Sequence, residues 1–217
     1  MEILQILRSR FGFEDFRGVQ QPTLECILSG ENTLALMATG TGKSLCYQLP
    51  AMQFQLSAKS QNSQAVDSKL VLVISPLIAL MEDQVQKAKD LGIQAGCLHS
   101  GQKSDFREKT LQLLQNRQLH LLLVTPERFA KEAFLQALKA NTIGLLVVDE
   151  AHCLSVWGHD FRPDYSRLGD IQQQLGQPVT LALTATATPA VKTDICRTLR
   201  IDEKNIQDGG IERPNLG

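Results

Sequence analysis

The sequence has few features of a secreted, membrane-bound or metal-stapled protein. Its five cysteines are irregularly spaced without a CxxC pair, which argues against a disulfide framework and against a zinc site in this chain. The longest apolar run, LVLVISPLIALM, is interrupted by Ser75 and Pro76 and is too short to span a bilayer. No basic region of an export signal follows Met1. We therefore expect an intracellular protein in a reducing compartment, without a membrane partner.

A large net charge is also missing. The chain carries 22 Lys and Arg against 23 Asp and Glu, a formal net charge of −1. Any contact with a polyanion such as nucleic acid must therefore come from local groups. Aromatic residues make up only 5% of the chain and include a single tryptophan. A length of 217 residues suits one sizeable core and is short for two.

Six short apolar runs alternate with helical patterns along the chain. The runs occupy residues 33–37, 70–75, 95–99, 120–125, 143–149 and 179–184. They are almost continuously apolar, as parallel strands covered on both faces are. Helical patterns follow at 76–92 and 103–117, and a helical hairpin is expected over 1–30. This order predicts an α/β fold with a parallel sheet and helices on both faces.

Two local features interrupt this alternation. Residues 55–68, QLSAKSQNSQAVDS, are rich in Gln, Ser and Asn, so we expect an exposed loop there that is compatible with disorder. Pro50 lies in the helical stretch that follows the first strand, and we expect it to kink or end that helix because it lacks a backbone N–H.

The segment MATGTGKS after the first strand has the composition of a phosphate-binding loop. Gly40 and Gly42 allow backbone N–H groups to turn onto phosphate oxygens, Lys43 can reach the β- and γ-phosphates, and the Ser44 hydroxyl can bind Mg²⁺. The match is imperfect because Met37 occupies the place of the first glycine in the general pattern. The alternative for these residues alone is a Gly/Thr turn with a solvated lysine.

Paired carboxylates end another predicted strand. Asp149 and Glu150 lie at the end of the run 143–149, where carboxylates are costly unless they meet a cation or water. In P-loop enzymes the Asp holds Mg²⁺ and the next acidic residue can orient the attacking water. The alternative is an acidic pair that only caps a turn. The phosphate-binding loop and this pair, in this order, favour a nucleoside triphosphatase.

With these residues, the chain resembles the first RecA-like motor domain of superfamily 2 helicases, and within it the RecQ family of DNA helicases. FGFEDFRGVQ (11–20) resembles the RecQ motif before motif I, which implies Phe13 against adenine with Arg17 and Gln20 hydrogen-bonding it. The other matching segments are MATGTGKS, VISPLIALMEDQV (73–85), TPERF (125–129), DEAH (149–152) and ALTATAT (182–188).

The resemblance implies ATP and Mg²⁺ as cofactors and assigns the site residues. The nucleotide-binding residues are Phe13, Arg17, Gln20, Thr39, Gly40, Thr41, Gly42, Lys43 and Ser44; the catalytic residues are Lys43, Asp149, Glu150 and His152; and the Mg²⁺ ligands are Ser44 and Asp149. The chain departs from the family pattern at Ala38, Thr41 and Val156. We expect Thr41 to be tolerated, whereas Val156 leaves any hydrogen bond from that position in doubt.

The stretch after DEAH, CLSVWGHDFRPDY, resembles the aromatic-rich loop through which RecQ enzymes sense single-stranded DNA. The residues implied in DNA contact and coupling are Trp157, His159, Phe161, Arg162, Thr184 and Thr186. Stacking on unpaired bases contributes roughly 1–3 kcal/mol per base. The alternative is that Trp157 and Tyr165 pack under the sheet edge, which we favour for Tyr165.

The resemblance implies a 3′-to-5′ DNA helicase motor that acts on single-stranded and duplex DNA. We expect residues 31–210 to form the first RecA-like domain, and 211–217, with ERPNL, to begin a linker to a second one. That second domain would supply arginine fingers, so this chain alone is expected to be largely inactive. The expected location is the cytoplasm of a bacterium or the nucleus of a eukaryote.

Three alternatives are weaker. A P-loop kinase would need an acceptor-binding lid, and the sequence has a tryptophan loop instead. A nucleotide-gated binding module without catalysis is disfavoured by intact Lys43, Ser44, Asp149 and Glu150. An RNA helicase of the DEAH type shares motif II, but WGHDFRPDY after it points to the RecQ branch.

Overall fold

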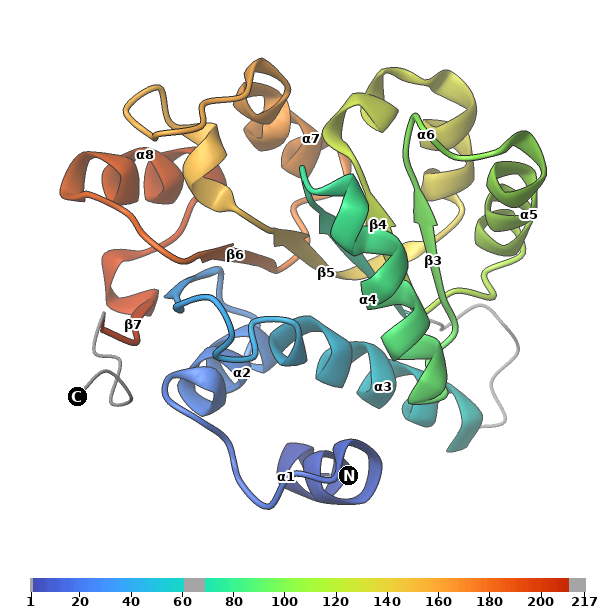
Figure 1. Cartoon of the computed structure of the whole chain (residues 1–217), viewed down its shortest axis with the longest axis horizontal. Helices are drawn as coiled ribbons and strands as arrows, with labels where there is room; N and C mark the ends of the chain where they lie inside the picture. The colour runs from blue at the N-terminus through green and yellow to red at the C-terminus, as the bar shows by residue number, and fades with distance from the viewer. Residues whose placement is uncertain (1, 61–68, 211–217) are drawn as a thin grey trace.

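A seven-stranded sheet forms the centre of the computed structural model, which describes residues 2–60 and 69–210 (Figure 1). The strands are β1 (Thr33–Leu36), β2 (Lys69–Ile74), β3 (Ala95–Leu98), β4 (Leu121–Val124), β5 (Thr142–Val148), β6 (Thr180–Thr184) and β7 (Ile206–Asp208). Their order is β3-β4-β2-β5-β6-β1-β7, and all neighbours are parallel. The predicted parallel α/β sheet is confirmed.

Helices cover both faces of this sheet. They are α1 (Ile3–Ile6), α2 (Gln20–Leu28), α3 (Leu45–Ser60), α4 (Ile78–Asp90), α5 (Ser104–Gln115), α6 (Glu132–Lys139), α7 (Leu168–Gln174) and α8 (Pro189–Leu199). Residues of α1 to α4 pack in the hydrophobic cluster on one face, and residues of α5 to α8 pack in the cluster on the other (Figure 1). Among the described residues, no helix is long and apolar enough to cross a membrane.

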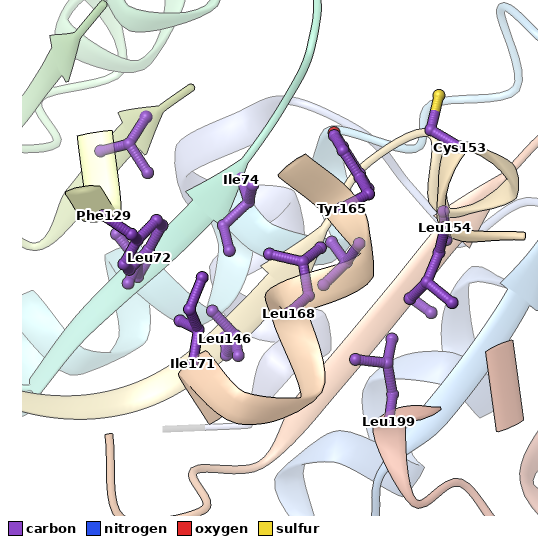
Figure 2. Packing of buried hydrophobic residues seen from close by; sticks show 14 of the residues in the cluster. Leu72, Ile74, Phe129, Leu146, Cys153, Leu154, Tyr165, Leu168, Ile171 and Leu199 are labelled. Carbon is purple, nitrogen blue, oxygen red and sulfur yellow. The ribbon is translucent and has the colours of Figure 1, made fainter. Parts of the chain in front are cut away.

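The strands are apolar at nearly every position because alternate side chains enter different clusters. In β2, Leu72 and Ile74 join the cluster that contains α5 to α8, whereas Val71 and Val73 join the opposite one. Figure 2 shows two residues of the first cluster, Ile74 near Leu168 of α7 and Leu72 beside Phe129. A parallel strand buried on both faces therefore needs the continuous apolar runs from which the sheet was predicted.

The third helix is longer than predicted. Helix α3 continues through Pro50 to Ser60, so Pro50 does not end it and residues 55–60 are helical rather than a loop. Burial of Leu49 and Met52 next to the proline offsets the missing hydrogen bond, which costs about 3 kcal/mol. The rest of the predicted loop, 61–68, lies outside the described residues.

Gln55 shows why polar composition misled the prediction. Its side chain is buried, donates to the carbonyl oxygen of Gly92 at 2.8 Å and accepts from the backbone N–H of Gln94 at 2.8 Å. The glutamine amide thus satisfies two backbone groups in the turn between α4 and β3. A polar residue can be part of the packed structure when its hydrogen bonds are complete.

The N-terminal helical region and strand β7 differ from the sequence prediction. A π-helical turn, Leu7–Phe11, follows α1, and α2 comes after a loop, so the expected helical hairpin corresponds to two helical segments. Strand β7 was not predicted. It is three residues long, contains Gln207 and Asp208, and pairs only with β1 at the sheet edge, so it has no apolar run to signal it. The predicted linker, 211–217, lies outside the described residues.

The five cysteines are all free, and four of them are buried. Burial raises the pKa of the Cys46 thiol to about 12. Burial, followed by the charge of Asp160, also raises the pKa of Cys153 to about 12.

We predict that the native protein reacts rapidly with a disulfide reagent at Cys26 alone, since thiolates are the reactive species. Titration in denaturant should expose the rest, and rapid reaction of a native Cys26→Ser variant would contradict this.

Candidate nucleotide site and aromatic loop

The predicted phosphate-binding loop joins the end of β1 to the start of α3. Gly40 and Gly42 have φ of 84° and 86°, left-handed values that favour glycine. Thr41 between them has no positive φ, and its hydroxyl donates to the carbonyl oxygen of Ala38 at 2.7 Å. Thr41 is therefore accommodated, as expected. Thr39 is exposed in the same loop.

Met37 takes the place of the first glycine in the general pattern and continues the hydrogen bonding of β1 to β6. Its N–H donates to the carbonyl oxygen of Thr184 at 2.9 Å, and its sulfur lies 3.9 Å from the Cys46 sulfur in the core. Met37 is 3% exposed. The side chain thus packs inward before the loop turns, so glycine is not required at this position.

Lys43 of this loop meets the carboxylate pair that follows β5. Its Nζ lies 3.5 Å from Oε1 of Glu150, and both side chains are mostly buried. Glu150 has a φ of 48°, a left-handed conformation that is strained for a residue other than glycine. This backbone geometry directs the carboxylate toward the loop that follows β1. The structure therefore brings together two residues separated by more than a hundred positions in sequence.

Asp149 is the more constrained carboxylate of the pair. Its two oxygens accept from the N–H of Glu150 at 3.0 Å and from the Ser75 hydroxyl at 3.2 Å. Burial and then the neighbouring charge of Glu150 raise the pKa of Asp149, while Lys43 and the two hydrogen bonds act in the opposite direction. An anion in such surroundings is stabilised by an added cation. The site thus has the electrostatics of a divalent-cation ligand.

His152 connects this pair with the end of β6. Its Nδ1 lies 3.0 Å from Oγ1 of Thr184 and 3.3 Å from Oε2 of Glu150. The Thr184 hydroxyl donates to the carbonyl oxygen of Thr186 at 3.0 Å, so it accepts from a protonated Nδ1. Burial lowers the pKa of His152. A neutral ring with hydrogen on Nδ1 can donate to both Thr184 and Glu150, linking the segment that follows β5 to the end of β6.

The aromatic loop lies directly beside this histidine. The ring of His159 stacks on His152 with centroids 4.3 Å apart and an interplanar angle of 16°. Trp157 is 73% exposed and Phe161 is 39% exposed, so neither is a core residue. The packing alternative is thus wrong for Trp157. Exposed rings on a loop that stacks against His152 are available for a ligand that stacks.

Two further residues fix the far end of the loop. Arg162 donates to Asp160 at 2.9 Å and to the carbonyl oxygen of Pro76 at 3.4 Å, so it contacts the turn before α4. Tyr165 is fully buried, as favoured from sequence, and Figure 2 shows it in the core near Leu168. Its hydroxyl donates to the carbonyl oxygen of Asp149 at 3.1 Å, a contact that the sequence did not reveal.

The N-terminal motif lines a cavity of about 510 Å³ next to the phosphate-binding loop. Phe13 is 44% exposed and lies beneath the Arg17 guanidinium, whose carbon is 5.7 Å from the ring centroid. Gln20 is buried: its amide oxygen accepts from the Arg17 N–H, and its nitrogen donates to the carbonyl oxygens of Thr41 and Gly42. The motif is therefore joined to the loop, and adenine recognition by Gln20 stays a prediction.

The same cavity has a wall that sequence reasoning missed. It is lined on one side by Gln48 of α3 and by Gln84, Lys87 and Leu91 in and just after α4. Gln84 accepts from Gln48 at 3.4 Å, which ties the two helices together. The spacing of 84, 87 and 91 places these side chains on one helical face, which is the signal that could have identified them. Ser44 also lines the cavity.

Strand, glycine loop and helix, with Lys43 opposite an acidic pair that follows β5, define a P-loop nucleoside-triphosphate-binding domain. The DEAD/DEAH box helicase family model matches residues 17–194. The chain belongs to this family.

Relatives place the chain more narrowly. It is 40% identical to the ATP-dependent DNA helicase RecQ of Haemophilus influenzae, over 98% of this chain and 32% of that protein. It is 41% identical to the probable ATP-dependent DNA helicase RecS of Bacillus subtilis, over 99% of this chain and 40% of that protein. The chain thus spans between about a third and two fifths of these curated relatives. The resemblance to RecQ helicases is confirmed.

Solved structures support the fold. The hypothetical ATP-dependent RNA helicase from Sulfolobus tokodaii superposes with a TM-score of 0.66 at 19% identity, covering 95% of this chain and 55% of that one. At this identity the likeness concerns the fold alone. It agrees with the RecA-like architecture expected from the motifs.

Gly158 in the aromatic loop leaves no room for a side chain. An added Cβ would clash with the carbonyl oxygen of His152 and lie 3.0 Å from that of Ser155. We predict that Gly158→Ala shifts the emission of Trp157, the single tryptophan, and lowers the free energy of unfolding by about 1–3 kcal/mol.

The matched control is Gly101→Ala, whose Cβ would meet only the His99 ring, at 3.7 Å or more. Emission spectra and denaturant unfolding check both variants. Identical behaviour of the two alanine variants would show that the loop can relax around the clash.

Proposed function

We propose that this chain is the ATP-binding motor domain of a RecQ-like 3′-to-5′ DNA helicase, which couples ATP hydrolysis to movement along single-stranded DNA and to unwinding. One observation carries the proposal. His152 contacts Glu150 and Thr184 and also stacks on His159 of the exposed aromatic loop. A ligand that moves the loop therefore acts on a residue that touches the acidic pair.

The nucleotide site would operate through exchange of charge partners. Lys43 pairs with Glu150 at 3.5 Å, and the phosphates of ATP compete for the same ammonium group. Once Lys43 binds phosphate, Glu150 is free to orient and deprotonate the attacking water. His152 holds the other oxygen of Glu150 at 3.3 Å and limits its rotation.

The residues present fit a magnesium ion. Ser44 and Asp149 offer a hydroxyl and a carboxylate, the oxygen ligands that Mg²⁺ prefers. Burial and then the charge of Glu150 raise the pKa of Asp149, and a nearby cation would favour its charged form. When bound, the ion neutralises charge on the phosphate oxygens. Ser75 and the Glu150 N–H keep the Asp149 carboxylate oriented.

DNA contact is assigned to the aromatic loop and its surroundings. Trp157 and Phe161 are exposed and suited to stacking on unpaired bases. Arg162 can exchange its bond to Asp160 for a phosphate or a base edge. Thr184 and Thr186 would transmit a movement of the loop to the end of β6. The partners we propose are single-stranded and duplex DNA and a second RecA-like domain, in a bacterial cytoplasm or a eukaryotic nucleus.

A nucleotide-gated DNA-binding module without helicase activity is the second candidate. It is favoured by the exposure of Trp157 and Phe161, whose rings can stack on unpaired bases whether or not ATP is hydrolysed. Against it stands the complete set of catalytic candidates, in which Lys43, Asp149 and His152 each contact Glu150.

ATPase rates with and without single-stranded DNA test the proposal. We predict that these 217 residues alone bind ATP, hydrolyse it slowly with little DNA stimulation and unwind nothing. The reason is that arginine fingers from a second domain raise rates by roughly 10³–10⁵ in comparable NTPases. A full-length protein with both RecA-like domains should show DNA-stimulated hydrolysis and unwinding.

In that full-length protein, Lys43→Ala should abolish both activities, whereas Lys103→Ala, at an exposed position before α5, should not. Robust strand separation by the 217-residue chain would contradict the requirement for a second domain. Absence of DNA-stimulated hydrolysis in the full-length protein would favour the binding module.

Trp157→Ala in the full-length protein tests the role of the loop. We expect ATP binding to persist and DNA-stimulated hydrolysis to be lost, since one stacking ring contributes about 1–3 kcal/mol. ATP binding and ATPase rates over a range of single-stranded DNA concentrations measure the two effects. Phe106→Ala, at a ring that is 63% exposed on α5, is the control. Equal stimulation of the Trp157→Ala variant and the wild type would reject the assignment.

A further inference from the structure

The hydroxyl of Ser155 makes two hydrogen bonds that connect the aromatic loop to α8. It donates to Oδ2 of Asp194 at 2.6 Å and accepts from the backbone N–H of Trp157 at 3.2 Å. Ser155 is 1% exposed, so water does not compete freely for these bonds. A short hydrogen bond to a carboxylate is stronger than one between neutral groups. The backbone of Trp157 is therefore tied, through one serine, to a charged residue on a different element.

Asp194 has no evident role in capping its own helix. It is the sixth residue of α8 (Pro189–Leu199), and the N-cap is Thr188, whose side chain accepts from the N–H of Val191. Its carboxylate instead divides between two partners: Oδ2 accepts from Ser155, and Oδ1 accepts from Arg197 at 2.8 Å. Arg197 is largely exposed, so its pairing contributes little. The buried partner is the one on the aromatic loop.

The turn that presents the tryptophan is built around the same serine. The carbonyl oxygen of Ser155 accepts from the N–H of Gly158 at 2.9 Å, and its hydroxyl accepts from the N–H of Trp157. Together these bonds hold the backbone on both sides of the Trp157 ring, which itself is exposed. The ring direction is thus set by the turn rather than by packing of the ring.

Helix α8 follows the segment that carries Thr184 and Thr186. The loop is therefore attached to two successive elements, to the end of β6 through His152 and Thr184 and to α8 through Ser155 and Asp194. A cavity of about 380 Å³ beside the loop is lined by Trp157, His159, Thr186 and Val191, among others. Two attachments prevent the loop from pivoting about a single contact.

We propose that Asp194 is a positioning residue for DNA coupling: through Ser155 it holds the backbone of Trp157 so that the ring faces single-stranded DNA and moves together with α8. The proposal rests on the proposed function for its consequence in catalysis. Its structural part concerns only this chain. Removal of the carboxylate should loosen the turn without removing any group that touches nucleotide.

Trp157 is the only tryptophan, so its fluorescence reports on the turn directly. In this chain, Asp194→Ala and Ser155→Ala should lower the anisotropy of Trp157 and increase its quenching by acrylamide. Asp194→Asn retains an oxygen that can accept from Ser155 and should restore most of the wild-type anisotropy. Arg197→Ala removes the other partner of Asp194 and should change neither signal, and Asp105→Ala, exposed on α5, is the matched control.

In the full-length protein, Asp194→Ala should raise the DNA concentration for half-maximal ATPase stimulation by about tenfold, because a hydrogen bond to a charged group is lost. The maximal rate at saturating DNA should fall much less. Asp194→Asn should recover most of the affinity. A purely structural role would instead lower stability in every variant and leave the half-saturating concentration unchanged.

The two parts of the proposal fail separately. The proposal is overturned if Asp194→Ala and Ser155→Ala both keep the wild-type anisotropy of Trp157 and the wild-type DNA concentration for half-maximal ATPase stimulation. If the full-length wild type shows no DNA stimulation, the proposed function fails, while the anisotropy of this chain still decides whether Asp194 positions the turn. Thermal unfolding identifies a variant that does not fold. If Asp194→Ala does not fold, the Trp157 anisotropy of Asp194→Asn is compared with that of Ser155→Ala instead.

Discussion

The site depends on the parallel pairing of β5, β6 and β1. Leu36 of β1 is in register with Thr184 of β6, and Val148 of β5 is in register with Ala182. Because the strands are parallel, the loops that follow them leave the sheet at the same edge. The lysine loop, the acidic pair and the threonines therefore meet although they are far apart in sequence. The contacts of Glu150 with Lys43 and of His152 with Thr184 follow from this alignment.

At that edge of the sheet, two carboxylates face one lysine. Asp149 and Glu150 are adjacent carboxylates, and Lys43 is the cation that balances them. Near a protein surface, a charge pair at about 4 Å gains on the order of 4 kcal/mol before the cost of desolvation, which offsets much of it. Such a pair can exchange partners. A triphosphate that takes Lys43 leaves Glu150 with His152, and this exchange links nucleotide binding to the geometry of the acidic pair.

The aromatic loop combines an exposed tip with buried attachments. Trp157 is open to solvent, whereas Ser155 and His152 beneath it are buried and hydrogen-bonded to α8 and β6. Tyr165 at the far end of the loop is bonded to the backbone of Asp149. A loop of this kind can respond to a ligand at its tip and transmit the change through rigid contacts, because its anchors are shared with the nucleotide site.

Sequence and structure agree most closely where burial alone decides. All six predicted strands were found within two residues of their predicted bounds, since strands buried on both faces must be apolar throughout. The misses occur where tertiary contacts outweigh composition. Helix α3 runs past Pro50, and polar Gln55 is buried because turn carbonyl and N–H groups satisfy its amide. Strand β7 exists only because β1 offers an edge to pair with.

By itself, the sequence determined the fold class, the phosphate-binding loop, the acidic pair and the identity of the aromatic loop, because each is a local pattern with its own chemistry. Tertiary structure alone decided which groups touch. The stacking of His159 on His152, the Tyr165 bond to Asp149 and the attachment of Ser155 to Asp194 join segments that only folding brings together. Hydrogen bonds and ring contacts act over a few ångströms, and residue order does not specify such distances.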